Sequence, residues 1–166
     1  MPSEAIFLIQ LIAGYVAWLL CFNAYAWPWL KSVERGHALR AIATLHGFRF
    51  FGLVFILPGV VGPGLPSGFA TVAAYGDFAT GALALMALAA VRIRPLFWLF
   101  VAAFNAVGVG DLLVDYYDAI RLGLPAVAGE MGSAYAIPVL YVPLLMITHV
   151  AAIVLLLRPS RTHAVA

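Results

Sequence analysis

Charged residues are scarce in this sequence: Asp, Glu, Lys and Arg together make up 10% of its 166 residues. A soluble globular domain of average composition carries about 25% of these residues. Hydrophobic residues make up 65% of the chain, and the mean hydropathy is +1.05. The composition therefore excludes a soluble domain and predicts an integral membrane protein, with the lipid bilayer as its main partner.

The sequence also has only one cysteine and lacks several common catalytic motifs. The single cysteine, Cys21, excludes an internal disulfide and a multi-cysteine metal or iron–sulfur site within one chain. No lysine lies within a predicted span, which excludes a retinal Schiff base. The sequence has no Gly-rich phosphate loop, no His-Glu-x-x-His and no Gly-x-Ser-x-Gly motif, so ATP hydrolysis and the familiar protease mechanisms are excluded.

Long apolar stretches dominate what is present. A membrane-spanning helix needs about 20 apolar residues to cross a hydrocarbon core of about 30 Å. Five stretches are long enough: 5–30, 39–61, 70–91, 95–120 and 136–157. The sequence thus predicts an all-α bundle of five transmembrane helices, in which residues 1–166 form a single transmembrane domain.

The four connections between these stretches differ in composition. The connection 31–40 is charged, 62–68 is rich in Gly and Pro and cannot remain helical, and 92–94 is a short basic turn before Pro95. The last connection, 121–133, is the longest and is rich in Gly and Ala. It has enough length to form a short interfacial helix or a lid.

The basic residues at the span ends are distributed unevenly between the two predicted membrane surfaces. One side carries Lys31, Arg35, Arg40, Arg92, Arg94, Arg158 and Arg161, and the other carries Arg121 alone. The positive-inside tendency places the first group in the cytoplasm, with the N-terminus outside and the C-terminus inside. Because lipid topology accounts for these charges, the net charge of +2 gives no support to nucleic-acid binding. We expect the bacterial inner (plasma) membrane as the location.

A few polar side chains fall at membrane depth, where a charged group costs about 3 to 15 kcal/mol unless it has a partner or a wet cavity. Apart from Asn23 in the first span, they are His46, Arg49, Asp77, Asn105, Asp111, Asp115 and His149, which we name the polar track. His46 and Arg49 are three residues apart, and the three polar-track residues of the fourth span share one stripe. We expect these faces to meet inside the bundle.

Arg49 needs a counter-ion, and Asp77 or Asp111 is the candidate within reach of its long side chain. A purely structural role is the alternative for this pair, because polar contacts between transmembrane helices also hold helices together. Asp111 and Asp115, four residues apart, could ligate a cation or share a proton. No further carboxylate or histidine follows at a suitable spacing, so no dedicated metal site is expected.

His46 and His149 lie on different spans at similar depth, which is the arrangement that a bis-histidine haem site requires. Four glycines near them would leave room for a haem b: Gly47, Gly52, Gly108 and Gly110. Two alternatives stay open for these histidines. Each could carry a proton or contact a ligand, or it could only join two helices through a hydrogen bond.

Two other patterns concern helix packing. Ala102, Ala106 and Gly110 form a ridge of small residues at four-residue spacing, which allows close helix approach within the chain or between subunits. Because a bundle of five helices is thin and gains from further packing, we expect a homo-oligomer. Pro138 and Pro143 should kink or locally unwind the fifth span.

The polar track supports three functions of different classes. The first, and the leading prediction, is a small carrier, proton-linked or anion-binding, with a proton or small-molecule ligand near the bilayer midplane. The second is a membrane b-type cytochrome with His46 and His149 as axial ligands. The third is an intramembrane enzyme in which a histidine and a carboxylate act on a lipophilic substrate.

Overall fold

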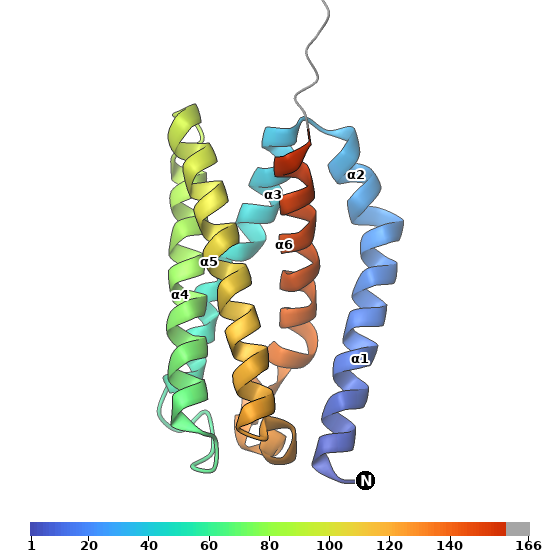
Figure 1. The fold of residues 1–166 in the computed structure, drawn as a ribbon, viewed down its shortest axis with the longest axis vertical. Coiled ribbons are helices and arrows are strands. Elements are labelled where there is room, and N and C mark those ends of the chain that lie inside the picture. The colour runs from blue at the N-terminus through green and yellow to red at the C-terminus, as the bar shows by residue number, and fades with distance from the viewer. Residues whose placement is uncertain (159–166) are drawn as a thin grey trace, which may run out of the picture.

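The computed structural model describes residues 1–158, and these form helices joined by short connections (Figure 1). Five helices are long and apolar enough to cross a membrane: Ser3–Ser32, Arg35–Ile56, Ser67–Ala89, Arg94–Arg121 and Ile137–Leu157. No strand occurs within this part of the chain. The predicted all-α class and the five spans are confirmed. Arg161, which we counted in the charge pattern, lies outside the described residues.

The first span consists of α1 (Ser3–Cys21), a π-helical turn η1 (Phe22–Ala26) and α2 (Trp27–Ser32). The widened turn comes just before Pro28, whose ring clashes with the carbonyl one regular turn earlier. This span is the least buried of the five. It packs on one side against the lid segment 124–135, residues 137–141 and the helix that follows them, and most of its remaining surface is exposed.

The second span changes its helical form halfway along. α3 (Arg35–Gly47) is a regular α-helix, whereas η2 (Phe48–Ile56) is a 3-10 helix. The buried residues of η2 are Arg49, Gly52 and Phe55, a spacing of three that matches the three residues per turn of a 3-10 helix. All three therefore lie on one face of η2.

The second span ends at Ile56 and not, as predicted, at position 61. Leu57 is extended, with φ −77° and ψ 122°, because the next residue is a proline. Gly59 then adopts a φ of 82°, a conformation that glycine reaches without strain. The proline and glycine of this loop thus end the helix in spite of the apolar composition of 57–61.

The third and fourth spans are unbroken α-helices, α4 (Ser67–Ala89) and α5 (Arg94–Arg121). A short turn joins them, and a proline occupies the first turn of α5 as the sequence predicts. α4 packs along both α5 and η2. Gly81 permits the contact with η2, since a Cβ at this position would lie 3.0 Å from the backbone nitrogen of Phe50.

The fifth span begins with a π-helical turn, η4 (Ile137–Tyr141), and continues as α6 (Val142–Leu157). Pro138 lies inside the π-helical turn and Pro143 lies in the first turn of α6. The predicted local unwinding is therefore present at Pro138. Pro143 follows the end of this turn by two residues, as Pro28 follows the end of η1, so the widened turn also accommodates the ring of Pro143.

The connection before the fifth span consists of 3-10 turns, η3 (Leu124–Tyr135), which depart from helical geometry at Val127 and Gly132. Glu130 fixes this segment to the loop between η2 and α4. Its backbone oxygen accepts a hydrogen bond from the Gly62 nitrogen at 2.6 Å, and its Oε2 accepts one from the Gly64 nitrogen at 2.9 Å. We call η3 the lid, because it covers one end of the bundle.

α6 lies between α1 on one side and the pair α4 and α5 on the other (Figure 1). The junctions α2–α3 and α4–α5 and the end of α6 share one end of the bundle, which we call the basic end. It carries Lys31, Arg35, Arg92, Arg94 and Arg158. The N-terminus, the loop 57–66 and the lid lie at the opposite, lid end. Which end faces the cytoplasm stays a prediction.

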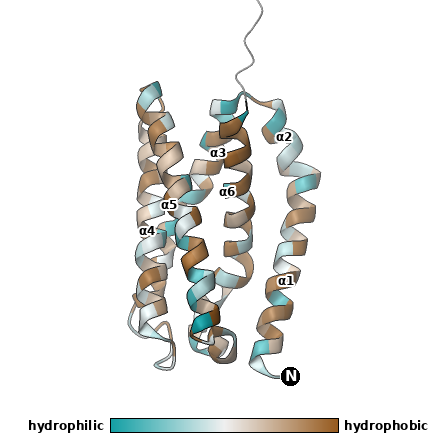
Figure 2. Ribbon diagram, in the orientation of Figure 1, coloured by the Kyte–Doolittle hydropathy of each residue, from teal (hydrophilic) through white to brown (hydrophobic). Residues whose placement is uncertain are grey.

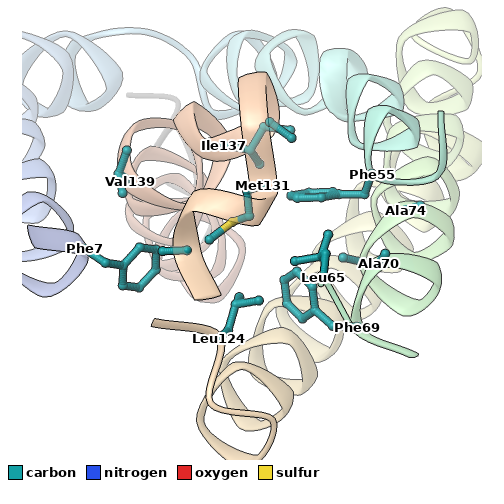
Figure 3. Packing of buried hydrophobic residues seen from close by; sticks show 13 residues of the cluster. Phe7, Phe55, Leu65, Phe69, Ala70, Ala74, Leu124, Met131, Ile137 and Val139 are labelled. Atoms are coloured by element: carbon teal, nitrogen blue, oxygen red, sulfur yellow. The ribbon is translucent and has the colours of Figure 1, made fainter. Parts of the chain in front are cut away.

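Two groups of buried hydrophobic residues fill the bundle. The lid-end core includes Phe7, Phe55, Phe69, Leu124 and Met131 (Figure 3). The basic-end core joins α3, α4, α5 and α6 and includes Leu39, Ile42, Ala84, Phe97, Val101, Phe104, Ala152 and Leu155. In Figure 2 hydrophobic residues cover long stretches of the helices, whereas the lower part of α5 is hydrophilic.

The ridge of small residues on α5 lies on the outer surface. Ala102, Ala106 and Gly110 are all exposed, and no atom lies within 4 Å of a Cβ built on Gly110. The ridge is therefore accessible to lipid or to a second subunit. A homo-oligomer stays a prediction.

At Gly14 the backbone of α1 closely approaches that of η4. A Cβ at Gly14 would overlap the backbone oxygen of Val139 in η4. We expect Gly14→Ala to lower the free energy of unfolding by about 1 to 3 kcal/mol, because α1 must move away from η4. Gly110→Ala is the matched control and should not destabilise. Thermal unfolding in mild detergent measures both, and equal melting temperatures for the two variants would contradict this packing.

Candidate functional site

Arg49 is the centre of the polar residues inside the bundle. It lies on η2, and its side chain is fully buried, with 0% exposure. Its Nε donates to Oδ1 of Asp77 on α4 at 2.6 Å, and its Nη2 donates to Oδ2 of Asp111 on α5. Both residues that the sequence offers as a counter-ion for Arg49 therefore form ion pairs with it.

The remaining terminal nitrogen of Arg49 contacts α5 and α6. Its Nη1 lies 3.2 Å from Nε2 of His149 and 3.5 Å from the backbone oxygen of Gly108. Because a guanidinium can only donate, Nε2 of His149 accepts and its Nδ1 carries the hydrogen. That Nδ1 donates to Oδ1 of Asn105 at 3.0 Å, and Nδ2 of Asn105 donates to the backbone oxygen of Val101 at 2.8 Å. The network thus holds His149 as a neutral ring.

His46 lies against His149, with ring centroids 4.0 Å apart and an angle of 44° between the rings. Its Nε2 is 3.0 Å from Oγ1 of Thr148. The Thr148 hydroxyl hydrogen already points to a backbone oxygen of α6, so His46 donates this bond. Its Nδ1 is buried and has no hydrogen-bond partner among residues 1–158. We call His46, Arg49, Asp77, Asn105, Asp111 and His149 together the Arg49 cluster.

The two histidines do not fit a haem in this arrangement. Bis-histidine ligation places the iron and the plane of the macrocycle between two ring nitrogens. Here the rings of His46 and His149 contact each other directly, both are fully buried, and both nitrogens of His149 are hydrogen-bonded. A macrocycle would have to separate the rings and break the bond between Arg49 and His149.

Glycines on three different elements make room for the Arg49 cluster. A Cβ at Gly52 of η2 would overlap the Asp77 side chain, and a Cβ at Gly76 of α4 would overlap the Asp111 carboxylate. A Cβ at Gly108 of α5 would overlap the ring of His149. Gly52 and Gly108, which the sequence offers as space for a haem, therefore accommodate protein side chains instead.

Asp115 lies on α5 one helical turn beyond Asp111, at the lid-end side of the Arg49 cluster. It is half-buried, and its Oδ1 has no hydrogen-bond partner in the part of the chain that the structure describes. Next to it, the hydroxyl of Tyr116 lies 2.6 Å from the hydroxyl of Tyr15 on α1. Asp115 and Asp77 lie on different helices and line the same cavity.

The polar track is therefore one connected group, with six members in the Arg49 cluster and Asp115 beside it. Asn23 is exposed on η1 and takes no part. Sequence reasoning missed Thr148 and Gly76. The signal for Thr148 was available, because it is a polar residue in an apolar span directly beside His149. No group of three or more His, Cys, Asp or Glu within residues 1–158 is arranged to hold a metal ion.

Removing the charge of Arg49 tests how the cluster is held together. Arg49→Met leaves two buried carboxylates without their partner, and we expect the protein to lose about 3 to 5 kcal/mol of stability. Adding Asp77→Asn and Asp111→Asn to this variant should restore part of the loss. Arg121→Met is the control: it breaks the pair with Asp118, in which the arginine is exposed to solvent, so we expect a smaller loss of about 1 kcal/mol. Detergent melting curves in which Arg49→Met matches the wild type would contradict this account.

Comparison with known proteins gives one family. The family described as "Domain of unknown function (DUF8737)" has a model that matches residues 6–157. Comparison with the curated proteins and with the solved structures gives no match. The matched range contains all of the Arg49 cluster and Asp115. Because it covers most of the sequence, the chain belongs to the DUF8737 family.

Proposed function

We propose that this protein is a small proton-linked membrane carrier in which the Arg49 cluster and Asp115 bind the proton. The observation that carries the proposal is an imbalance of charge. Two carboxylates, those of Asp77 and Asp111, pair with one guanidinium, and a third, that of Asp115, lies one helical turn beyond Asp111. An unneutralised charge inside a membrane bundle is costly. A bound proton neutralises one carboxylate without requiring a large change in structure.

The histidines do not supply the missing positive charge. Nε2 of His149 accepts from Arg49, so a proton on this nitrogen would oppose the guanidinium. His46 packs against His149 and is fully buried. The other ionisable side chains around the site are the hydroxyl groups of Tyr15, Tyr116 and Tyr141 and the carboxylate of Asp118. Asp118 already has its own cation, because it pairs with Arg121 at 2.9 Å. The carboxylates are therefore the groups that gain and lose the proton.

The geometry favours a proton over an anion as the bound species. All three nitrogens of the Arg49 guanidinium already donate to protein groups. An anion would have to displace a carboxylate that carries the same charge and is already in place. The excess of carboxylates would also repel an anion.

The two sides of the Arg49 cluster differ in a way that favours a carrier over an open channel. Toward the basic end lies the basic-end core, in which Leu39, Val101 and Phe104 are fully buried. Toward the lid end, Asp77 and Asp115 face a cavity. Access from one side at a time is what alternating access requires.

The orientation that we propose places the basic end in the cytoplasm and the lid outside, in a bacterial inner membrane. The basic end has the cation–aromatic contacts of a membrane interface. Arg35 lies 4.7 Å from the ring centroid of Trp98, and Arg158 lies 5.1 Å from that of Trp27. Tryptophan and arginine are enriched at this depth, and basic residues favour the cytoplasmic side.

Infrared difference spectroscopy tests the bound proton directly. We expect the purified protein to show the carbonyl stretch of a protonated carboxylic acid at neutral pH, because the three carboxylates cannot all stay charged around one guanidinium. Asp115→Asn should remove or shift this band. Asp118→Asn is the matched control on the same helix, and it should leave the band unchanged, because Asp118 pairs with Arg121 at 2.9 Å. The absence of a protonated acid in the wild type would overturn the proposal.

Proteoliposomes that contain a pH-sensitive dye test the coupling to transport. Cationic, neutral and anionic solutes are added in turn while a proton gradient is imposed. We expect at least one solute to cause proton movement that Asp115→Asn abolishes and Asp118→Asn preserves. Proton movement of equal rate in both variants, or in empty liposomes, would contradict a role for the cluster.

A further inference from the structure

A cavity of about 200 Å³ lies between the Arg49 cluster and the lid. Its walls are almost wholly apolar and come from α1, η2, α4, α5, the lid and η4. Six of the hydrophobic residues that line it are also members of the lid-end core: Ala73 and, labelled in Figure 3, Phe7, Phe55, Phe69, Leu124 and Ile137. The space is therefore formed by well-ordered core residues of several elements.

The size of the cavity limits what it holds. An apolar cavity of about 150 Å³ binds benzene. A cavity of about 200 Å³ therefore suits one aromatic ring with a short chain, or an alkyl group of similar volume. A lipid headgroup or a nucleotide would be too large and too polar for these walls.

The charged groups in the lining determine what kind of polar group the ligand carries. Asp77 and Asp115 are the charged residues among the lining side chains, and both are acidic. The hydroxyl of Tyr116, which also lines the cavity, is paired with that of Tyr15. Oδ1 of Asp115 is buried and has no partner within residues 1–158. The two carboxylates thus give this apolar cavity a negative charge, which complements a cationic donor.

The cavity reaches the lipid-facing surface between α1 and α5. Leu8 on α1 and Ile120 on α5 both line it, and their exposed fractions are 43% and 80%. The hydroxyl bond between Tyr15 and Tyr116 joins α1 and α5 beside this opening, so widening the opening requires that bond to break. A ligand with an apolar body can therefore enter from the hydrocarbon region of the bilayer.

We propose that this cavity binds a small lipophilic primary amine, with its ammonium group between Asp115 and Asp77 and its apolar body against Phe7, Phe69 and Ile137. The inference rests on the proposed function and names the class of molecule that is carried. The ammonium supplies the positive charge that the bound proton otherwise supplies. When a charged amine binds to the protonated site, Asp115 passes its proton to water, so the carboxylate becomes charged and the two cations exchange one for one.

Calorimetry in detergent with three probes of similar shape tests this assignment: 2-phenylethylamine, ethylbenzene and 3-phenylpropionate. We expect the amine to bind about tenfold or more tightly than ethylbenzene, and the acid not to bind. Titrations in two buffers of different ionisation enthalpy should show that amine binding releases a proton. Equal binding of the amine and ethylbenzene would overturn the proposal, and so would preferred binding of the acid.

Two variants of α5 distinguish the contribution of the cavity to amine binding from that of the carboxylates. Ala119→Leu fills the cavity, and we expect it to weaken amine binding about tenfold or more while the infrared band of the protonated acid persists. Ala102→Leu, on the exposed face of the same helix, should bind the amine like the wild type. If the wild type shows the infrared band but binds no amine, only the assignment of the ligand is overturned. If the band is absent, the proton-linked function fails as well.

Discussion

The buried charge of Arg49 is the constraint on which the rest of this structure depends. Its guanidinium has partners on α4, α5 and α6 and is itself carried by η2, so one side chain joins four of the five spans. Removing only the guanidinium, or only its carboxylate partners, leaves an unpaired charge inside the bundle. This is far more costly than replacing the guanidinium and the carboxylates together by apolar residues. The first span has no part in these bonds, which agrees with its small buried surface.

Local backbone geometry follows from the need to surround this charge. Gly52, Gly76 and Gly108 allow the helices to approach until the carboxylates and the His149 ring reach the guanidinium. The 3-10 form of η2 places Arg49, Gly52 and Phe55 on one face. Arg49 on this face belongs to the Arg49 cluster, and Phe55 lines the cavity between that cluster and the lid.

Much of the fold could be predicted from the sequence, because the length of an apolar stretch is a direct measure of whether it spans a bilayer. The pairing of Arg49 with Asp77 and Asp111 was predictable for a similar reason, since a membrane charge demands a partner. The form of η2 and the contacts of Glu130 with Gly62 and Gly64 were not, because they depend on which segments meet in space. The haem hypothesis shows the same limit: similar depth on two spans says nothing about the distance between two rings.

The 3-10 form of η2 also determines how far the second span reaches. A 3-10 helix rises about 2.0 Å per residue and an α-helix about 1.5 Å, so the segment Phe48–Ile56 is about 4 to 5 Å longer than it would be as an α-helix. The second span of 22 residues therefore extends about 37 Å along its axis. In spite of its early end at Ile56, the span is therefore longer than a hydrocarbon core of about 30 Å, so it crosses the bilayer at a tilt or extends into the headgroup region.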